Sequence, residues 1–372
     1  MAPRGLIDLP SVAGETGPDL SATLLRTLLR SVAFALASVA VLAVLYSFGL
    51  VDLGRIADAF RRRWDLLAAN VVCILAVAVI AVARNAWALR VLGAPIPLAR
   101  VAGANLVSQG LGQWAPGSIV VTEGLRIGIL MGARAADRPN ASTLARIGVA
   151  SLGDRLIGLG VCFVVGGVAT LALSLGRPAA TPALLYLLAC AYLAVGAMLS
   201  ALPLAGDTAP IRWLASLLAK PGGPRLAARL TGTFASALRL GGDSSADWRR
   251  NRRFVVTYLL AALAAVLNAA QLALASGETG GAIPWPVLMA AYPATYAGVI
   301  LPLGFAGFGA PQLVAAAVFA AFGVAARAVI AMSLFQTTLL LAAQTLLGVG
   351  WAALRGDEVV RAFGRAGAGR QA

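Results

Sequence analysis

The sequence predicts an all-α, polytopic membrane protein with about eight transmembrane helices and further broken or re-entrant segments. The first observation is composition, since 60% of the 372 residues are hydrophobic and only 12% are charged. The second is that long uncharged runs recur along the chain, and about 20 apolar residues suffice for a helix to cross the hydrocarbon layer. The third is that these runs do not alternate between polar and apolar residues, as the strands of a membrane barrel do.

The uncharged runs give the expected spans in chain order. They cover residues 31–51, 66–83, 156–176, 178–206, 254–277, 279–326 and 328–354. The run 279–326 is long enough for two crossings at about 20 residues each. The runs therefore supply the eight expected helices.

The charges between the spans divide the chain into five regions. We expect an amino-terminal tail (1–30), a first membrane half (31–206), a basic loop (207–253), a second membrane half (254–354) and a carboxy-terminal tail (355–372). The tails, the basic loop and residues 84–100 and 134–146 together hold 22 basic residues, against six on the opposite side. Since basic residues are enriched in cytoplasmic loops, both termini and the basic loop are predicted to be cytoplasmic.

Composition also argues against several functions. The net charge of +15 is explained by this orientation, so we expect no nucleic-acid partner. There is no histidine, and the three cysteines lie within the spans without paired spacing, so no metal and no cofactor are expected. An enzyme is not expected either. An intramembrane transferase with Glu123 and Asp154 as acid and base stays an alternative, although no activated nucleophile or nucleotide loop is recognisable.

Each membrane half contains a segment that is interrupted by glycine and proline. The first runs from Asn105 to Arg134 and the second from Tyr292 to Leu313. Such breaks are tolerated at membrane depth only where the backbone is buried in protein or lines a cavity. Paired breaks in corresponding halves are typical of a midplane binding site between inverted repeats. Two independently kinked helices are the alternative.

Four charged residues lie close to these apolar segments. Glu123 and Arg126 are three residues apart and share one helix face, whereas Asp154 and Arg155 are adjacent and point about 100° apart. Charges at membrane depth normally face protein, water or a ligand. We expect one network in which Glu123 meets Arg155 and Asp154 meets Arg126. The alternatives are purely structural neutralisation and, for Arg155, a position at the membrane boundary.

Two neutral polar residues, Asn268 and Gln271, lie deep in the span 254–277. Hydrogen bonds between helices are their more common use in membrane proteins. We therefore expect them to join helices, with ligand contact as the less frequent alternative.

At these positions the chain resembles the lysylphosphatidylglycerol synthase transmembrane family. The first half carries five elements of the family pattern. They are an arginine–tryptophan signature at Arg84, Trp87 and Arg90, an asparagine at Asn105, a Pro-Gly at Pro116 and Gly117, a Glu-x-x-Arg at Glu123 and Arg126, and an acid–Arg–Leu at Asp154, Arg155 and Leu156. The second half carries the glycine-rich turn, at Pro302, Gly304, Gly307 and Gly309. The chain departs from the family pattern at Asp154, where the family has glutamate, and at Gln312, where glutamate is usual. We expect no lysyl-transferring soluble domain of the kind that larger relatives carry, so the resemblance does not imply aminoacyl transfer.

The resemblance implies a flippase-like membrane domain in a bacterial inner (plasma) membrane. We expect a multi-pass protein that binds and translocates a lipid with an anionic headgroup, either a phospholipid or an isoprenoid-linked lipid. The alternative is an accessory protein that does not transport and supports a lipid- or glycan-synthesising enzyme. The expected substrate-binding residues are Glu123, Arg126, Asp154, Arg155, Asn105, Pro116, Gly117, Pro302, Gly304, Gly307, Gly309 and Gln312.

Overall fold

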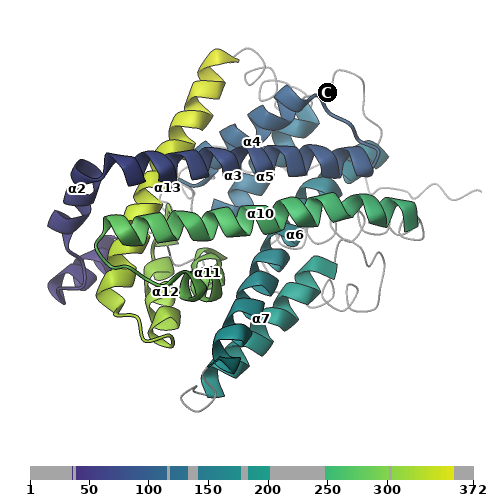
Figure 1. The fold of residues 1–372 in the computed structure, drawn as a ribbon. Helices are drawn as coiled ribbons and strands as arrows, with labels where there is room; N and C mark the ends of the chain where they lie inside the picture. The colour runs from purple at the N-terminus through teal and green to yellow at the C-terminus, as the bar shows by residue number, and fades with distance from the viewer. Residues whose placement is uncertain are drawn as a thin grey trace, which may run out of the picture.

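The computed structural model describes residues 36, 39–114, 118–132, 141–176, 183–201, 248–300 and 304–355. This part of the chain is helical apart from one two-stranded hairpin (Figure 1). Its helices long and apolar enough to cross a membrane lie within α3 (Trp64–Val91), α6 (Ala141–Leu175), α7 (Ala183–Ala201), α10 (Trp248–Glu278) and α13 (Ala326–Leu354). The predicted all-α, polytopic membrane fold is confirmed.

Two predicted regions are only partly described. The expected span 31–51 is seen as a helix over residues 39–47, and most of the basic loop lies outside the described residues. Between the first span and α3 lies the short helix α2 (Leu53–Arg62). The ring of Phe60 in α2 lies 4.4 Å from the ring of Phe335 in α13, which attaches α2 to the helix bundle.

Both glycine- and proline-rich segments are pairs of short helices. The first pair is α4 (Leu98–Gly112) and α5 (Ser118–Gly132). The second pair is α11 (Trp285–Ile300) and α12 (Ala310–Ala320), joined through β1 (Gly304–Phe305) and β2 (Phe308–Gly309). With 15, 15, 16 and 11 residues, all four fall short of the roughly 20 residues that a full crossing needs.

The prediction of two full crossings in 279–326 was therefore wrong. The backbone reverses inside this run instead, at a turn where Gly307 and Gly309 have φ values of 82° and 101°. Glycine adopts positive φ without the steric cost that a side chain adds. Since an uncharged run reports hydrophobicity but not backbone reversal, its length overestimated the number of crossings.

The element order repeats along the chain. A long helix, two short helices and a long helix occur as α3–α4–α5–α6 and again as α10–α11–α12–α13. The contacts between the two sets are reciprocal, because α4 packs on α13 as α11 packs on α6, and α3 packs on its counterpart α10. Reciprocal contacts of this kind are what a two-fold relation produces.

The central helices α3 and α10 lie side by side and run in opposite directions (Figure 1). Leu66, at the start of α3, lies beside Gly277, at the end of α10. At the other end the indole Nε1 of Trp87 donates a hydrogen bond to the carbonyl oxygen of Arg253, at 2.8 Å. Antiparallel counterparts place the two halves in opposite orientations, which is the arrangement expected of an inverted repeat.

Close helix contacts fix the two halves against each other. Gly110 of α4 faces Gly348 of α13, and an ideal Cβ on Gly110 would lie 2.7 Å from the carbonyl oxygen of Gln344. Small residues that let helix backbones approach are typical of membrane bundles. The α4–α13 contact joins the first half to the second beside the site described next.

Candidate functional site: a charged cluster and a polar cavity

Five charged side chains from three helices form what we call the charged cluster: Arg84 of α3, Glu123 and Arg126 of α5, and Asp154 and Arg155 of α6. Asp154 lies at its centre. Arg84 Nε is 2.5 Å from Asp154 Oδ1, and Arg84 Nη2 is 3.4 Å from Oδ2. This is the two-pronged geometry in which a guanidinium holds a carboxylate most firmly.

Both predicted cross-pairs are present. Arg126 Nη1 lies 3.6 Å from Asp154 Oδ2, and Arg155 Nε lies 3.4 Å from Glu123 Oε1. Arg126 Nη2 also pairs with Glu123 on the same helix face. Helix α5 of the broken segment is thereby joined to α6 by ionic contacts as well as by packing.

Asn105 of α4 orients Arg126 of the charged cluster through a hydrogen bond. Its Oδ1 accepts a hydrogen bond from Arg126 Nη1 at 3.0 Å, and its Nδ2 donates to the carbonyl of Val101 at 2.8 Å and to Asn85 Oδ1 at 3.3 Å. The predicted substrate-binding residue Asn105 thus contacts Arg126 and is itself 2% exposed. In this structure it positions a charged side chain.

The cluster carries an excess of positive charge. Three arginines face two carboxylates, so the formal sum is 3 − 2 = +1. The side chain of Asp154 is 1% exposed and that of Arg126 is 4% exposed, whereas Arg155 retains 27%. Buried charges need full pairing, because removing one partner leaves an uncompensated ion. Arg155 is therefore the cation with the most access to a ligand.

The prediction that Arg84 begins the segment 84–100 outside the spans was wrong. Helix α3 continues to Val91, and Arg84 is 8% exposed inside it. The uncharged-run criterion ended the span at this arginine because it treated every charge as exposed. A charge that is paired within the protein does not end a span, and Asp154 supplies that pairing. The arginine–tryptophan signature of the family resemblance was the signal that marked the position.

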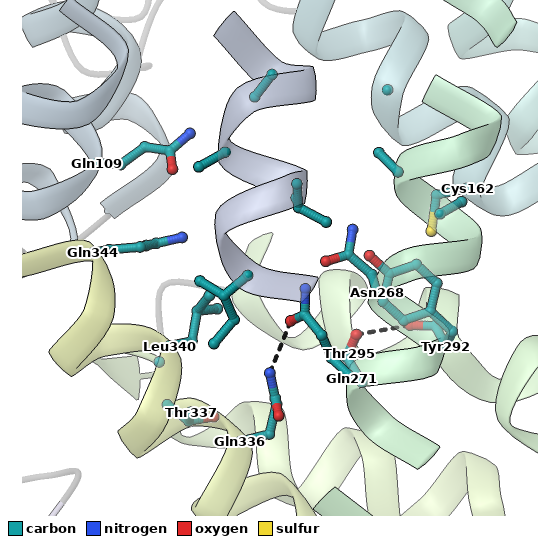
Figure 2. A pocket seen from close by; sticks show the side chains of 18 of the residues that line it. Gln109, Cys162, Asn268, Gln271, Tyr292, Thr295, Gln336, Thr337, Leu340 and Gln344 are labelled. Atoms are coloured by element: carbon teal, nitrogen blue, oxygen red, sulfur yellow. Dashed lines mark hydrogen bonds between the residues drawn. The ribbon is translucent and has the colours of Figure 1, made fainter. Parts of the chain in front are cut away.

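A cavity of about 270 Å³ lies between the two halves and borders the charged cluster. Arg84 and Arg155 line it, together with hydroxyl side chains on α5, α11 and α13. Carboxamide side chains are its most common polar group: Gln109, Gln113, Asn268, Gln271, Gln336 and Gln344. Figure 2 shows Gln109 and Gln344 on one side of the cavity and Asn268 with Gln271 on the other. The lining comes from both halves of the repeat.

A second polar group, which we call the carboxamide cluster, consists of Asn70, Gln271 and Gln336. Gln336 Nε2 donates to Gln271 Oε1 at 2.8 Å (Figure 2), and Asn70 Nδ2 donates to Gln336 Oε1 at 2.9 Å. The expectation that Gln271 joins helices is confirmed. Sequence reasoning missed Asn70 and Gln336, whose only signal was an uncharged amide within an apolar run.

The glycine-rich turn of the second half is held by Gln312. Its Oε1 accepts a hydrogen bond from the backbone N–H of Gly309 at 2.7 Å, and its Nε2 donates to the carbonyl of Gly307 at 3.1 Å. Gly304 pairs with Gly309 in the hairpin. A glutamate carboxylate has no N–H to donate to the Gly307 carbonyl. The turn therefore requires a side chain at position 312 that both accepts and donates a hydrogen bond, as glutamine does.

The remaining predicted residues of the two turns are Pro116, Gly117 and Pro302, which lie outside the described residues. Gly307 lines the cavity, as does Pro311 at the start of α12. The second turn thus faces the same cavity as Arg84 and Arg155. Among the predicted site residues that the structure describes, Arg155 and Gly307 line the cavity, one from each half, whereas the others do not.

Comparison with known proteins adds the family. The model of the family described as "Lysylphosphatidylglycerol synthase TM region" matches residues 30–348. The chain belongs to this family. No curated protein and no solved structure matches the chain. In this member of the lysylphosphatidylglycerol synthase TM region family, the matched part contains the whole charged cluster, both helix pairs and all the residues that line the cavity.

Proposed function

We propose that this protein binds a lipid with an anionic headgroup and translocates it across the membrane. The observation that carries the proposal is a polar cavity between inverted halves, bordered by a cluster with one excess positive charge. Further support comes from membership of a lysylphosphatidylglycerol synthase TM region family. We place the protein in a bacterial inner membrane, with both termini in the cytoplasm.

Arg155 is the residue proposed to receive the phosphate. It lines the cavity, and although its Nε lies 3.4 Å from Glu123 Oε1, that Nε makes no hydrogen bond in the described part of the chain. Guanidinium groups bind phosphate through paired, charge-assisted hydrogen bonds. Arg126 and Arg84 are paired with Asp154, so we assign them a positioning role: they keep the charged groups around Arg155 in place.

The proposed path leads the headgroup through the cavity while its tails stay in the bilayer. The cavity lining on α3 runs from Ile74 to Arg84, ten residues that correspond to about 15 Å of helix rise. The cavity therefore extends over about half of the roughly 30 Å hydrocarbon layer. The proposal includes no chemical step, because both carboxylates of the cluster are engaged by arginines.

The test is lipid translocation by the purified protein in proteoliposomes. The wild type is expected to move a fluorescent phosphatidylglycerol between leaflets. Arg155→Gln is expected to slow this movement about tenfold or more, since a hydrogen bond to a charged group contributes roughly 1.5–3 kcal/mol. The matched control is Arg327→Gln, which removes an arginine that is 57% exposed, is paired with Asp52 and does not line the cavity.

Two results would count against the proposal. Equal rates for Arg155→Gln and the wild type would remove Arg155 from the headgroup path. A wild-type protein that is folded but moves no lipid would leave the accessory role, in which the cavity holds a lipid for a synthesising enzyme. Copurification with such an enzyme would then be the expected finding.

A further inference from the structure

The polar lining of the cavity is unusual in its mixture of groups. Two arginines and six carboxamides face the space, and among the described residues that line it there is no aspartate or glutamate. The two acids of the charged cluster are already occupied, Asp154 by Arg84 and Arg126, and Glu123 by Arg126 and Arg155. A cationic headgroup entering this space would meet two arginines without a free carboxylate to balance it.

Two of the carboxamides, Gln271 and Gln336, lie on the helices that correspond in the repeat to those of Arg84 and Asp154. Arg84 lies seven residues before the end of α3, and Gln271 lies seven residues before the end of its counterpart α10. Arg84 pairs with Asp154 of α6, and Gln271 pairs with Gln336 of α13, the counterpart of α6. One repeat thus holds an ion pair at the position where the other holds a neutral amide pair.

Several carboxamides retain unused hydrogen-bonding groups. Gln271 is 2% exposed, and its Nε2 has no hydrogen-bond partner in the described part of the chain. Gln109 and Asn268 make no hydrogen bond to any other residue of that part, and both face the cavity. For the buried Gln271, an amide N–H without a partner costs about 1–3 kcal/mol. These amides therefore favour a ligand that supplies several donors and acceptors.

We propose that the cargo is a lipid whose phosphate carries a neutral polyol, such as a sugar or a sugar-like ring, and that cationic aminoacyl headgroups are excluded. The phosphate meets Arg155, and the hydroxyl groups meet Asn268, Gln271 and Gln109. A carboxamide both donates and accepts, which suits a hydroxyl that does the same. The inference rests on the proposed function and specifies its substrate class.

The experiment measures binding separately from transport. The purified full-length protein is titrated with water-soluble, short-chain lipids of four headgroups: phosphatidylinositol, phosphatidylglycerol, phosphatidic acid and lysylphosphatidylglycerol. We expect affinity to fall in that order, with phosphatidylinositol about two- to tenfold tighter than phosphatidic acid for each polyol hydrogen bond gained. A glucosylated isoprenyl phosphate, added as a fifth probe, shows whether diacyl or isoprenoid tails carry the polyol.

Two variants of Asn268 make the result specific. Asn268→Leu is expected to lower the affinity for phosphatidylinositol by about two- to tenfold, while leaving phosphatidic acid binding as it was. Asn268→Asp places a carboxylate in the cavity and is expected to raise the affinity for lysylphosphatidylglycerol. Gln109→Leu repeats the first test on the opposite wall, in case Asn268→Leu does not fold.

Equal binding of phosphatidylinositol and phosphatidic acid would overturn the inference, and so would lysylphosphatidylglycerol binding as tightly as phosphatidylinositol. In either case translocation of an anionic lipid in proteoliposomes would still support the proposed function. Conversely, the expected order of affinities without any translocation would uphold the substrate class and remove the transport role.

Discussion

Gly158 is the position at which one added methyl group tests the charged cluster most directly. An ideal Cβ on Gly158 of α6 would lie 2.9 Å from both Nη1 and Nη2 of Arg84 and 3.1 Å from its Cζ. Ordinary contacts between heavy atoms lie at about 3.5–4.0 Å. Gly158→Ala therefore pushes the guanidinium away by roughly 0.6–1.1 Å, which weakens its contact with Asp154 and takes the 3.4 Å contact between Nη2 and Oδ2 beyond hydrogen-bonding range.

The magnitude follows from two opposing effects. Breaking a buried ion pair by removing a partner costs about 3–5 kcal/mol, and a displaced arginine retains part of that interaction. Replacing glycine by alanine inside a helix stabilises the helix by about 1 kcal/mol. We expect Gly158→Ala to lower the free energy of unfolding by roughly 1–2 kcal/mol, as the difference between these effects.

Gly148 of the same helix provides the matched control. An ideal Cβ there meets no atom within 4 Å, so Gly148→Ala is expected to be neutral or to stabilise by up to about 1 kcal/mol. The assay is thermal unfolding of the purified variants, together with translocation of fluorescent phosphatidylglycerol. Indistinguishable melting temperatures for the two variants would refute the conclusion that the guanidinium of Arg84 packs against Gly158 while it pairs with Asp154.

Three further substitutions test other parts of the structure. Asp154→Asn leaves two buried arginines without their shared carboxylate and is expected to destabilise by about 3–5 kcal/mol, with partial recovery in the double variant Arg84→Gln/Asp154→Asn by thermal unfolding. Gln312→Glu removes an amide donor from the second turn and buries a carboxylate, so a lower melting temperature and slower translocation are expected. Gly110→Ala is expected to separate α4 from α13 and weaken folding in detergent, whereas Gly124→Ala, where a Cβ meets nothing within 4 Å, is expected to leave it unchanged.

The charged residues were the most predictable part of the candidate site. A charge in an apolar segment costs at least about 2.5–3.5 kcal/mol on insertion scales, so Glu123, Arg126 and Asp154 had to find partners. The cross-pairs between α5 and α6 were one arrangement that the sequence allowed, and the structure contains both of them. The same criterion failed for Arg84, because a buried and paired arginine looks in the sequence like the end of a span.

The neutral part of the site was harder to predict. Asn70 and Gln336 lie in different halves of the chain, 266 positions apart, and a single amide in an apolar run carries no signal of its partner. The number of short helices was also underdetermined, since hydropathy does not distinguish a crossing from a reversal. The positive φ values of Ala306, Gly307 and Gly309 and the antiparallel hairpin show where the chain turns back.

The two repeats differ in charge, and this difference gives a physical reason why a bound headgroup could enter at one end of the cavity and leave at the other. A cavity with arginine pairs at both counterpart positions would hold a phosphate tightly at each end, and a tightly held ligand leaves slowly. Transport requires binding that is favourable enough for entry and weak enough for exit, as in ion channels. The charged cluster of the first repeat has a formal charge of +1, whereas Gln271 and Gln336 in the second repeat are neutral. Under the proposed function, a phosphate is therefore attracted more strongly beside the charged cluster than beside the amide pair, and this difference favours release of the headgroup.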